Sequence, residues 1–235
     1  MKTVLYTGTT PPQEPPPGLH VVHAPALVRQ ALPFPTPTVE DLLQTPSHLL
    51  FYSQFAAELF LDHAAHCLLD VHHFWAVGAR TGALLEDHTG IGAHVPGDQS
   101  FQGLLRALEE RATPAPLISF SLQGILRDFS PLAAQWGVAF HDIPIYESAP
   151  APPEALRDAF DELMPRWVAI TSARGVDSLV DALGTEHLQT CHLAAIGPST
   201  AARCDELGLP AQVVCETPDR RRLLDLIAAH HEDPT

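Results

Sequence analysis

The sequence predicts an α/β protein with two similar domains, each built on a parallel sheet. Matching residues recur at a fixed offset of 119: Ser53 with Ser172, Gly78 with Gly197, Thr81 with Thr200, Val95 with Val214, and Leu104 with Leu223. In both copies, short apolar runs precede helix-period segments, a pattern typical of buried parallel strands in βαβ units. A fixed offset across about sixty residues indicates an internal duplication, which decides the architecture.

The N-terminal residues are predicted to form two strands and then a stiff connection. Thr3–Tyr6 and Leu19–His23 have strand patterns, and the proline-rich segment Pro11–Gly18 between them is a loop. Ala26–Leu32 is expected to be a mildly apolar turn. Proline at every second position in 33–37 then indicates an extended segment that crosses between the domains.

The first copy of the repeat follows this crossing. We expect Thr38 to cap a helix whose first turn holds Glu40 and Asp41. Apolar runs predict the strands, and Gly137 supplies the end of a further helix. The expected elements are strands at Leu49–Ser53, Phe74–Val77, Leu117–Phe120 and Val138–Glu147, and a helix at Leu126–Trp136.

The second copy is short of strands, which predicts the domain organisation. A second proline-rich crossing at 147–153 leads into a helix at Pro153–Met164 and then into this copy. The N-terminal strands are therefore expected to complete its sheet. We predict one discontinuous domain of residues 1–34 with 149–235, an inserted domain of residues 38–146, and linkers at 33–37 and 147–153. The ligand site is expected in the cleft between the two domains.

Composition excludes several classes of function. The 235-residue chain has a formal net charge of −15, which argues against a binder of nucleic acid or of anionic membranes. No apolar run reaches the length of a membrane span, and the N-terminus lacks the apolar core of a signal peptide, so a cytoplasmic protein is expected. The four cysteines form no Cys-x-x-Cys pair and are expected to stay reduced. His63 and His66 are three residues apart, but a metal site needs a third ligand, so we expect no metal.

Candidate binding residues gather where the predicted strands end. Each copy has a strand that runs into Gly-x-x-Thr at a helix start, where free amides and hydroxyls suit an anion. Parallel sheets bind ligands at the carboxyl ends of their strands. The candidates for substrate binding are Ser53, Gly78, Thr81, Ser172, Gly197, Ser199 and Thr200. The hydroxyl residues could instead only cap helices, and capping is compatible with ligand binding.

Charged residues near these positions have two interpretations. Arg174 is two residues from Ser172, and it could pair with a carboxylate or be a solvated surface charge. The basic run at 220–222 is expected to be a solvated helix face. A hydrolase built on Ser172 and His192 is disfavoured, because the sequence has no Gly-x-Ser-x-Gly elbow.

Four segments in order resemble the uroporphyrinogen-III synthase family: AVGART at 76–81, PIYES at 144–148, VAITSARGV at 168–176 and AIGPSTA at 195–201. The resemblance covers most of the chain from about Leu49 to Ala229. It implies two flavodoxin-like or Rossmann-like domains joined by a two-stranded linker. It also implies conversion of hydroxymethylbilane to uroporphyrinogen III, with inversion of ring D and loss of water, and without a metal or organic cofactor.

The resemblance assigns the catalytic candidate. The family has a tyrosine in a Tyr-Glu-Ser/Thr setting, which is Tyr146 here, and a phenol can donate a proton to a departing hydroxide. An aromatic side chain packed beside a strand end is the alternative interpretation. The family usually has Gly-Asn and an arginine after the third strand of the middle domain. Here Leu122 and Gln123 stand near that position, and Arg127 offers the charge for substrate binding.

Two functions from different classes follow. The first is a monomeric synthase that acts on a small-molecule substrate. The alternative is a two-lobed binding or regulatory protein that closes on an anionic small molecule without catalysis, since duplicated α/β lobes joined by two crossings fit that function as well.

Overall fold

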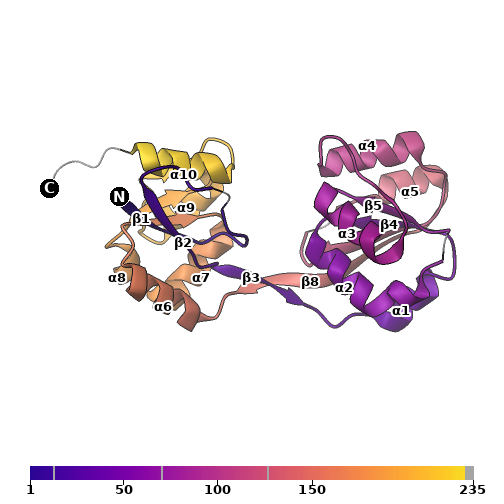
Figure 1. Cartoon of the computed structure of the whole chain (residues 1–235), viewed down its shortest axis with the longest axis horizontal. Coiled ribbons are helices and arrows are strands. Elements are labelled where there is room, and N and C mark those ends of the chain that lie inside the picture. The colour runs from indigo at the N-terminus through magenta and orange to yellow at the C-terminus, as the bar shows by residue number, and fades with distance from the viewer. Residues whose placement is uncertain (13, 70, 126, 231–235) are drawn as a thin grey trace. The chain divides into compact units, whose positions relative to one another are not determined.

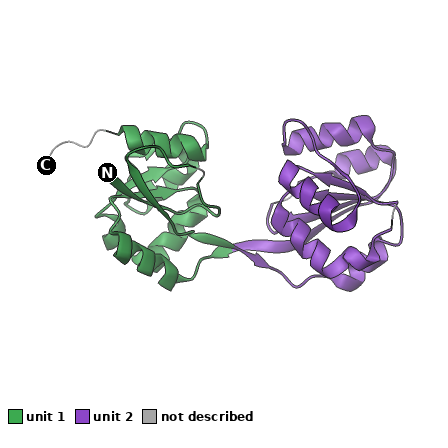
Figure 2. Cartoon of the chain, viewed as in Figure 1, with its two compact units in different colours: residues 1–28, 149–235 green, residues 29–148 purple. Residues whose placement is uncertain are grey.

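The computed structural model describes residues 1–12, 14–69, 71–125 and 127–230 (Figure 1). The chain divides into two compact units, which Figure 2 shows in different colours. Unit 1 consists of Met1–Val28 and Ala149–Thr235, and unit 2 consists of Arg29–Ser148. The chain therefore leaves unit 1 once and returns to it once.

Unit 1 is built on a five-stranded sheet in the order β11-β10-β9-β1-β2, in which every pair is parallel. Its strands are β1 (Lys2–Tyr6), β2 (Leu19–His23), β9 (Trp167–Ile170), β10 (His192–Ala195) and β11 (Val213–Val214). In β1 and β9, Val4 lies opposite Trp167. The two N-terminal strands thus belong to the same sheet as the strands of the C-terminal repeat.

Unit 2 is built on a six-stranded sheet in the order β3-β8-β7-β4-β5-β6. Its strands are β3 (Leu27–Ala31), β4 (His48–Phe51), β5 (His73–Ala76), β6 (Ala93–His94), β7 (Leu117–Leu122) and β8 (Phe140–Pro150). The pairs from β8 to β6 are parallel. At β3 the direction reverses, because Leu32 N bonds Ile145 O at 2.9 Å while Ala151 N bonds Ala26 O at 3.0 Å.

Helices bury both faces of the sheet in unit 1. In β9, Val168 and Ile170 pack into one apolar cluster, while Trp167 and Ala169 pack into the other. This two-sided burial explains why the strand is a continuous apolar run. The first face is covered by α6 (Pro153–Leu163), α7 (Ala173–Leu183), α8 (Thr185–Leu188) and α9 (Pro198–Glu206), and the second by α10 (Arg220–Ala229).

Unit 2 has the same layered arrangement. In β4, Leu49 and Phe51 face one cluster and Leu50 faces the other. Phe51 stacks on Phe120 with ring centroids 5.1 Å apart, so aromatic packing joins neighbouring strands. One face carries α1 (Thr36–Leu42), α2 (Gln54–Ala64), the 3₁₀ helix η1 (Ala65–Cys67) and α3 (Ala79–Thr89), and the other carries α4 (Phe101–Arg111) and α5 (Ser130–Trp136).

The offset of 119 residues also separates the first residues of matching elements. It relates β4 to β9, α2 to α7, β5 to β10, α3 to α9, and α4 to α10. The central part of each unit is therefore the same run of strands and helices. The other strands of the two sheets come from different places in the chain. In unit 1, β1 and β2 precede the repeated run, whereas in unit 2 β3 precedes it and β7 and β8 follow it.

A buried histidine starts β4 on the side of the sheet that α4 and α5 cover. His48 Nδ1 accepts a hydrogen bond from Trp75 Nε1 at 3.0 Å, and its Nε2 bonds Thr113 O at 2.8 Å. With one nitrogen accepting and the other donating, the ring is held in its neutral form. Burial accordingly lowers the pKa of His48, and the nearby His73 and His94 lower it further.

The structure corrects the predicted crossings between the units. The division at Val28/Arg29 lies upstream of 33–37, and that proline-rich segment belongs to unit 2. The expected turn at Ala26–Leu32 is wrong, because it contains strand β3 paired with β8. On the return, β8 runs to Pro150, so most of 147–153 is a strand. The pattern showed neither β3 nor the last residues of β8, because these two segments pair with each other across more than a hundred residues of sequence.

Two helix starts also differ from the prediction. The first helix of unit 2 begins at Thr36 with Pro35 as its N-cap, so the capping function assigned to Thr38 is wrong. Pro37 lies within the first turn, where a proline costs no hydrogen bond. The helix expected from Leu126 begins at Ser130 and ends at Gly137, whose φ of 69° closes it. Leu126 itself lies outside the described residues.

Candidate functional site

The carboxyl end of β4 presents Ser53, which caps helix α2. Its backbone is extended, and its Oγ accepts a hydrogen bond from the amide of Ala56 at 3.2 Å. A serine in this position satisfies one of the amides that a helix start leaves free. The capping function considered for Ser53 is therefore present.

Ser53 also contacts Tyr146, the predicted acid. Ser53 Oγ donates to Tyr146 Oη at 3.0 Å, and this bond joins residues 93 positions apart in sequence. The phenol ring packs edge-on against Phe55, with centroids 5.3 Å apart. Because Tyr146 Oη accepts from Ser53, its own proton can be donated to another acceptor. The structure thus brings together two residues that the sequence singled out separately.

Tyr146 lies inside a strand rather than at its end. Strand β8 continues to Pro150, and Tyr146 pairs with Leu122 of β7 across a register shift. The amide of Gln123 donates to the Tyr146 carbonyl at 2.8 Å. Gly124 follows with a φ of 80°, which turns the chain away from the sheet. The segment that departs from the family pattern therefore supports the backbone of Tyr146.

The carboxyl end of β5 leads into the N-terminus of α3. Gly78 is the N-cap, and as a glycine it has no side chain with which to cap the helix. The amide of Ala79 donates to Gln99 Oε1 at 3.3 Å. Thr81 is the third residue of α3, its amide bonds the Gly78 carbonyl at 3.0 Å, and its side chain is 5% exposed. Thr81 therefore lies nearly buried in the first turn of α3.

Arg127 lies over aromatic rings on the α4/α5 side of the sheet. Its guanidinium carbon is 4.4 Å from the centroid of the Tyr52 ring and 6.0 Å from that of Phe101. Tyr52 Oη accepts a hydrogen bond from Ser119 Oγ at 3.0 Å. Burial raises the pKa of Tyr52 strongly, so this phenol stays protonated. The arginine thus lies against two aromatic rings, and its N–H groups can still bind a carboxylate.

Unit 1 repeats the serine cap at the carboxyl end of β9. Ser172 is the N-cap of α7, and its Oγ accepts from the amide of Gly175 at 3.1 Å. Arg174 is the second residue of this helix and is exposed. Ser172 corresponds to Ser53 by the offset of 119, but the phenol contact is specific to Ser53. The two serines thus share the capping function and differ in their side-chain partner.

The N-terminus of α9 resembles that of α3. Gly197 is the N-cap, without a side-chain cap, and a Cβ at this position would lie 3.3 Å from Pro218 Cγ. Ser199 is exposed at the second helical position, next to Pro198. Thr200 is 2% exposed, and its amide bonds the Gly197 carbonyl at 3.1 Å. Ser199 therefore offers an exposed hydroxyl here, and Thr200 lies nearly buried in the same turn.

Sequence reasoning missed three phenol- or hydroxyl-bearing residues in or next to these strands: Tyr52 and Ser119 in unit 2, and Tyr6 in unit 1. Tyr6 ends β1 and is fully buried, and among the described residues its hydroxyl has no hydrogen-bond partner. A Cβ on Gly8 would lie 2.7 Å from the Tyr6 ring. These three residues could have been found from the sequence, because each is a hydroxyl-bearing residue that ends or interrupts an apolar run.

Ser172 and His192 lie too far apart to act together as a hydrolase pair. His192 lies opposite Trp167 at the amino end of β9, whereas Ser172 follows the carboxyl end of the same strand. Five residues of extended chain separate the two levels by roughly 16 Å. The basic run at 220–222 starts α10, where Arg221 pairs with Asp225 at 3.2 Å, so this arginine has a surface partner on its own helix.

Among the described residues, no helix combines the length and the apolar character required to cross a membrane. Comparison with known proteins gives a consistent result. A family model described as "Uroporphyrinogen-III synthase HemD" matches residues 17–225. No curated protein sequence gives a match.

Solved structures share the fold of this chain. The uroporphyrinogen-III synthetase from Helicobacter pylori superposes with a TM-score of 0.63 at 16% identity, over 97% of this chain and 99% of that one. A mutant uroporphyrinogen III synthase from the extremely thermophilic bacterium Thermus thermophilus superposes with a TM-score of 0.52 at 18% identity, over 97% and 98%.

Proposed function

The chain belongs to the uroporphyrinogen-III synthase family of cyclising lyases, and we propose that Tyr146, oriented by Ser53, supplies the proton for its first chemical step. The reaction converts linear hydroxymethylbilane into uroporphyrinogen III, with inversion of ring D and loss of water. The observation that supports the role of Tyr146 is the hydrogen bond of 3.0 Å in which its oxygen accepts from Ser53.

The first step breaks the bond between the terminal methylene carbon and its hydroxyl oxygen. Tyr146 donates its proton to the departing oxygen, which leaves as water, and the bilane becomes an electrophilic azafulvene. The substituted carbon of ring D then attacks the methylene carbon, and the resulting spiro intermediate fragments and recloses with ring D inverted. Ring D loses one proton when it regains aromaticity, which balances the proton that Tyr146 gave.

Positioning carries the rest of the catalysis. The linear substrate closes without an enzyme to the uninverted isomer, so the protein must control which carbon of ring D attacks. The substrate carries eight carboxylates. We propose that the helix starts at Gly78 and Gly197, with Ser172, Ser199, Arg127 and Arg174, bind them, since free amides at a helix N-terminus and arginine side chains attract carboxylates. Thr81 and Thr200, in the first turns of these two helices, belong to the same proposed binding set.

The alternative of a two-lobed binding protein predicts a different product. The test is to incubate the pure chain with hydroxymethylbilane, to stop and oxidise the mixture, and to separate the type I and type III isomers. A synthase yields mainly type III at a rate above that of spontaneous closure. A binding protein without catalysis yields type I at the spontaneous rate or more slowly, and that result would reject the proposed function.

We also propose that the protein is a monomer and that it is cytoplasmic. Each unit has its own buried core, and no disulfide forms between the four cysteines, all of which are described. Light scattering coupled to gel filtration should give the mass of one chain, 25.5 kDa. A mass of twice this value at micromolar concentration would reject the monomer.

A further inference from the structure

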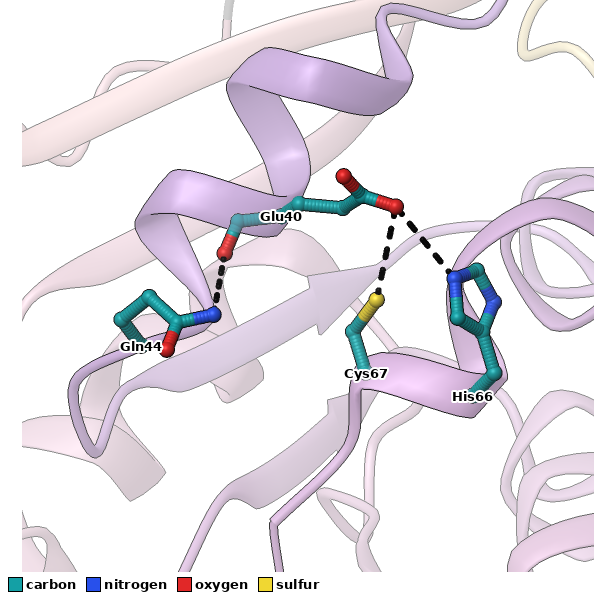
Figure 3. A network of polar contacts seen from close by, with 4 residues as sticks. All are labelled: Glu40, Gln44, His66 and Cys67. Atoms are coloured by element: carbon teal, nitrogen blue, oxygen red, sulfur yellow. Dashed lines mark hydrogen bonds and ion pairs between the residues drawn. The ribbon is translucent and has the colours of Figure 1, made fainter.

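Three side chains of different chemistry converge in unit 2, where helix η1 approaches helix α1. Glu40 lies on α1, and His66 and Cys67 are the last two residues of η1. Glu40 Oε1 is 3.3 Å from His66 Nε2 and 3.8 Å from Cys67 Sγ, as Figure 3 shows. All three atoms lie within 4.8 Å of one another. Among the described residues, no other set of three His, Cys, Asp or Glu side chains gathers its ligand atoms this closely.

The spacing of these atoms matches that of a tetrahedral metal shell. Zinc binds nitrogen and oxygen at about 2.0–2.2 Å and thiolate sulfur at about 2.3 Å. In a tetrahedron, such bonds place the ligand atoms roughly 3.3–3.7 Å apart. The contact of Glu40 with His66, at 3.3 Å, is already within this range, and its contact with Cys67, at 3.8 Å, is slightly longer. A small adjustment of exposed side chains would complete the shell, because His66 and Glu40 are 66% and 42% exposed.

The set of donor atoms selects the metal. A thiolate is a poor ligand for magnesium or calcium, whereas sulfur, imidazole nitrogen and carboxylate oxygen together suit zinc. The Cys67 thiol already lies against the Glu40 carboxylate. A divalent cation bound here would be held by the carboxylate, the imidazole and the sulfur together.

Neighbouring residues leave the three ligand atoms available. Gln44 bonds the backbone carbonyl of Glu40 at 3.2 Å and does not use its carboxylate. His63, which the sequence paired with His66, bonds Leu59 O at 2.8 Å and stacks on Phe34 with centroids 4.8 Å apart. His63 thus faces a different partner, and His66 completes the set with Glu40 and Cys67.

We propose that Glu40, His66 and Cys67 bind one zinc ion, with water in the fourth position. The ion would tie α1, the first helix after the chain enters unit 2, to the end of α2. Its role is structural, and it takes no part in cyclisation. At a hundredfold excess of zinc over its dissociation constant, the melting temperature should rise by roughly 5 °C or more.

Cobalt is the probe that tests the ligand set, because its spectrum reports both sulfur ligation and geometry. The full chain, without a histidine tag and with its thiols reduced, should bind one Co²⁺. Binding should give a thiolate-to-cobalt charge-transfer band in the near ultraviolet and the intense visible bands of a tetrahedral site. Zinc should displace the cobalt. Absence of the charge-transfer band would overturn the proposal.

Matched variants separate this site from general surface binding. Cys67→Ser should abolish the charge-transfer band, while Cys191→Ser, a half-buried cysteine of unit 1, should leave it unchanged. His66→Ala and Glu40→Gln should each weaken cobalt binding at least tenfold, while His63→Ala should not. Equal losses in the control and test variants would refute the assignment. A chelator should lower the melting temperature but leave the isomer ratio unchanged, so this proposal and the proposed function can fail independently.

Discussion

The bond between Ser53 and Tyr146 can be separated into a structural and a chemical contribution. Tyr146→Phe removes only the phenol oxygen, and Ser53 keeps the amide of Ala56 as a partner. No buried polar atom is then left without a bond, so the free energy of unfolding should fall by about 1 kcal/mol. Ser53→Ala removes both the phenol contact and the helix cap, and the cap is worth about 1 kcal/mol, so the loss should be about 2 kcal/mol.

The repeat supplies the matched control. Ser172→Ala removes the equivalent cap on α7 without any tyrosine contact, so it should cost about 1 kcal/mol. The difference between the two serine variants measures the phenol bond. In the double variant Ser53→Ala/Tyr146→Phe, the same bond is lost only once, so the loss should be about 1 kcal/mol smaller than the sum of the single variants.

The rates separate chemistry from stability. General acid assistance is worth about 10²–10⁴-fold, and a hydroxyl that leaves readily as water places Tyr146→Phe near the low end of this range. Ser53→Ala keeps the phenol and should slow the reaction less. The assay follows hydroxymethylbilane consumption and the share of type III isomer, beside urea unfolding of each variant. A Tyr146→Phe chain with the wild-type rate and isomer ratio would refute the proposed acid.

Three further predictions concern stability and reactivity. Gly8→Ala should lower the free energy of unfolding by about 1–3 kcal/mol, because its Cβ would lie 2.7 Å from the Tyr6 ring, while Gly92→Ala, with no atom within 4 Å, should have little effect in the same denaturation assay. The protein should lose stability as the pH falls below about 6.5, since burial lowers the pKa of His48 and the unfolded chain takes up the proton first. An unchanged pH slope in urea titrations of His48→Gln would exclude this histidine as a cause. Burial raises the pKa of Cys204 to about 11, so the native chain should resist labelling there by thiol reagents at pH 8, and fast labelling detected by mass spectrometry would contradict the burial.

Local patterns predicted the strand–helix units well. The apolar runs of β4 and β9, and the capping serines Ser53 and Ser172, depend on neighbours within a few residues, so they can be read from the sequence. The same holds for Gly137, which ends α5. The family motifs at 76–81 and 195–201 likewise mark the real starts of α3 and α9.

Features that depend on distant partners could not be predicted. Strand β3 forms because β8 lies beside it, and a short segment with three exposed residues has no apolar pattern of its own. The bond from Ser53 to Tyr146 and the stacking of Arg127 on Tyr52 join separate elements in the same way. The sequence could name these residues as candidates, but only the register of β7 and β8 shows which of them meet.

The divided sheet of unit 1 has a consequence for biosynthesis on the ribosome. Strand β1 is translated long before β9 and must wait for Trp167 of that strand before it has a neighbour on that side. Unit 2 is continuous, so it can fold as soon as Ser148 has left the ribosome. Once β3 and β8 are paired, the loop that must close for β1 to meet β9 shortens from 163 residues to roughly 40. The shorter loop lowers the entropic cost of closure by about 1.2 kcal/mol in free energy. Folding of unit 2 therefore lowers the entropic cost of folding unit 1. A variant that unfolds unit 2 should slow the folding of unit 1 as well.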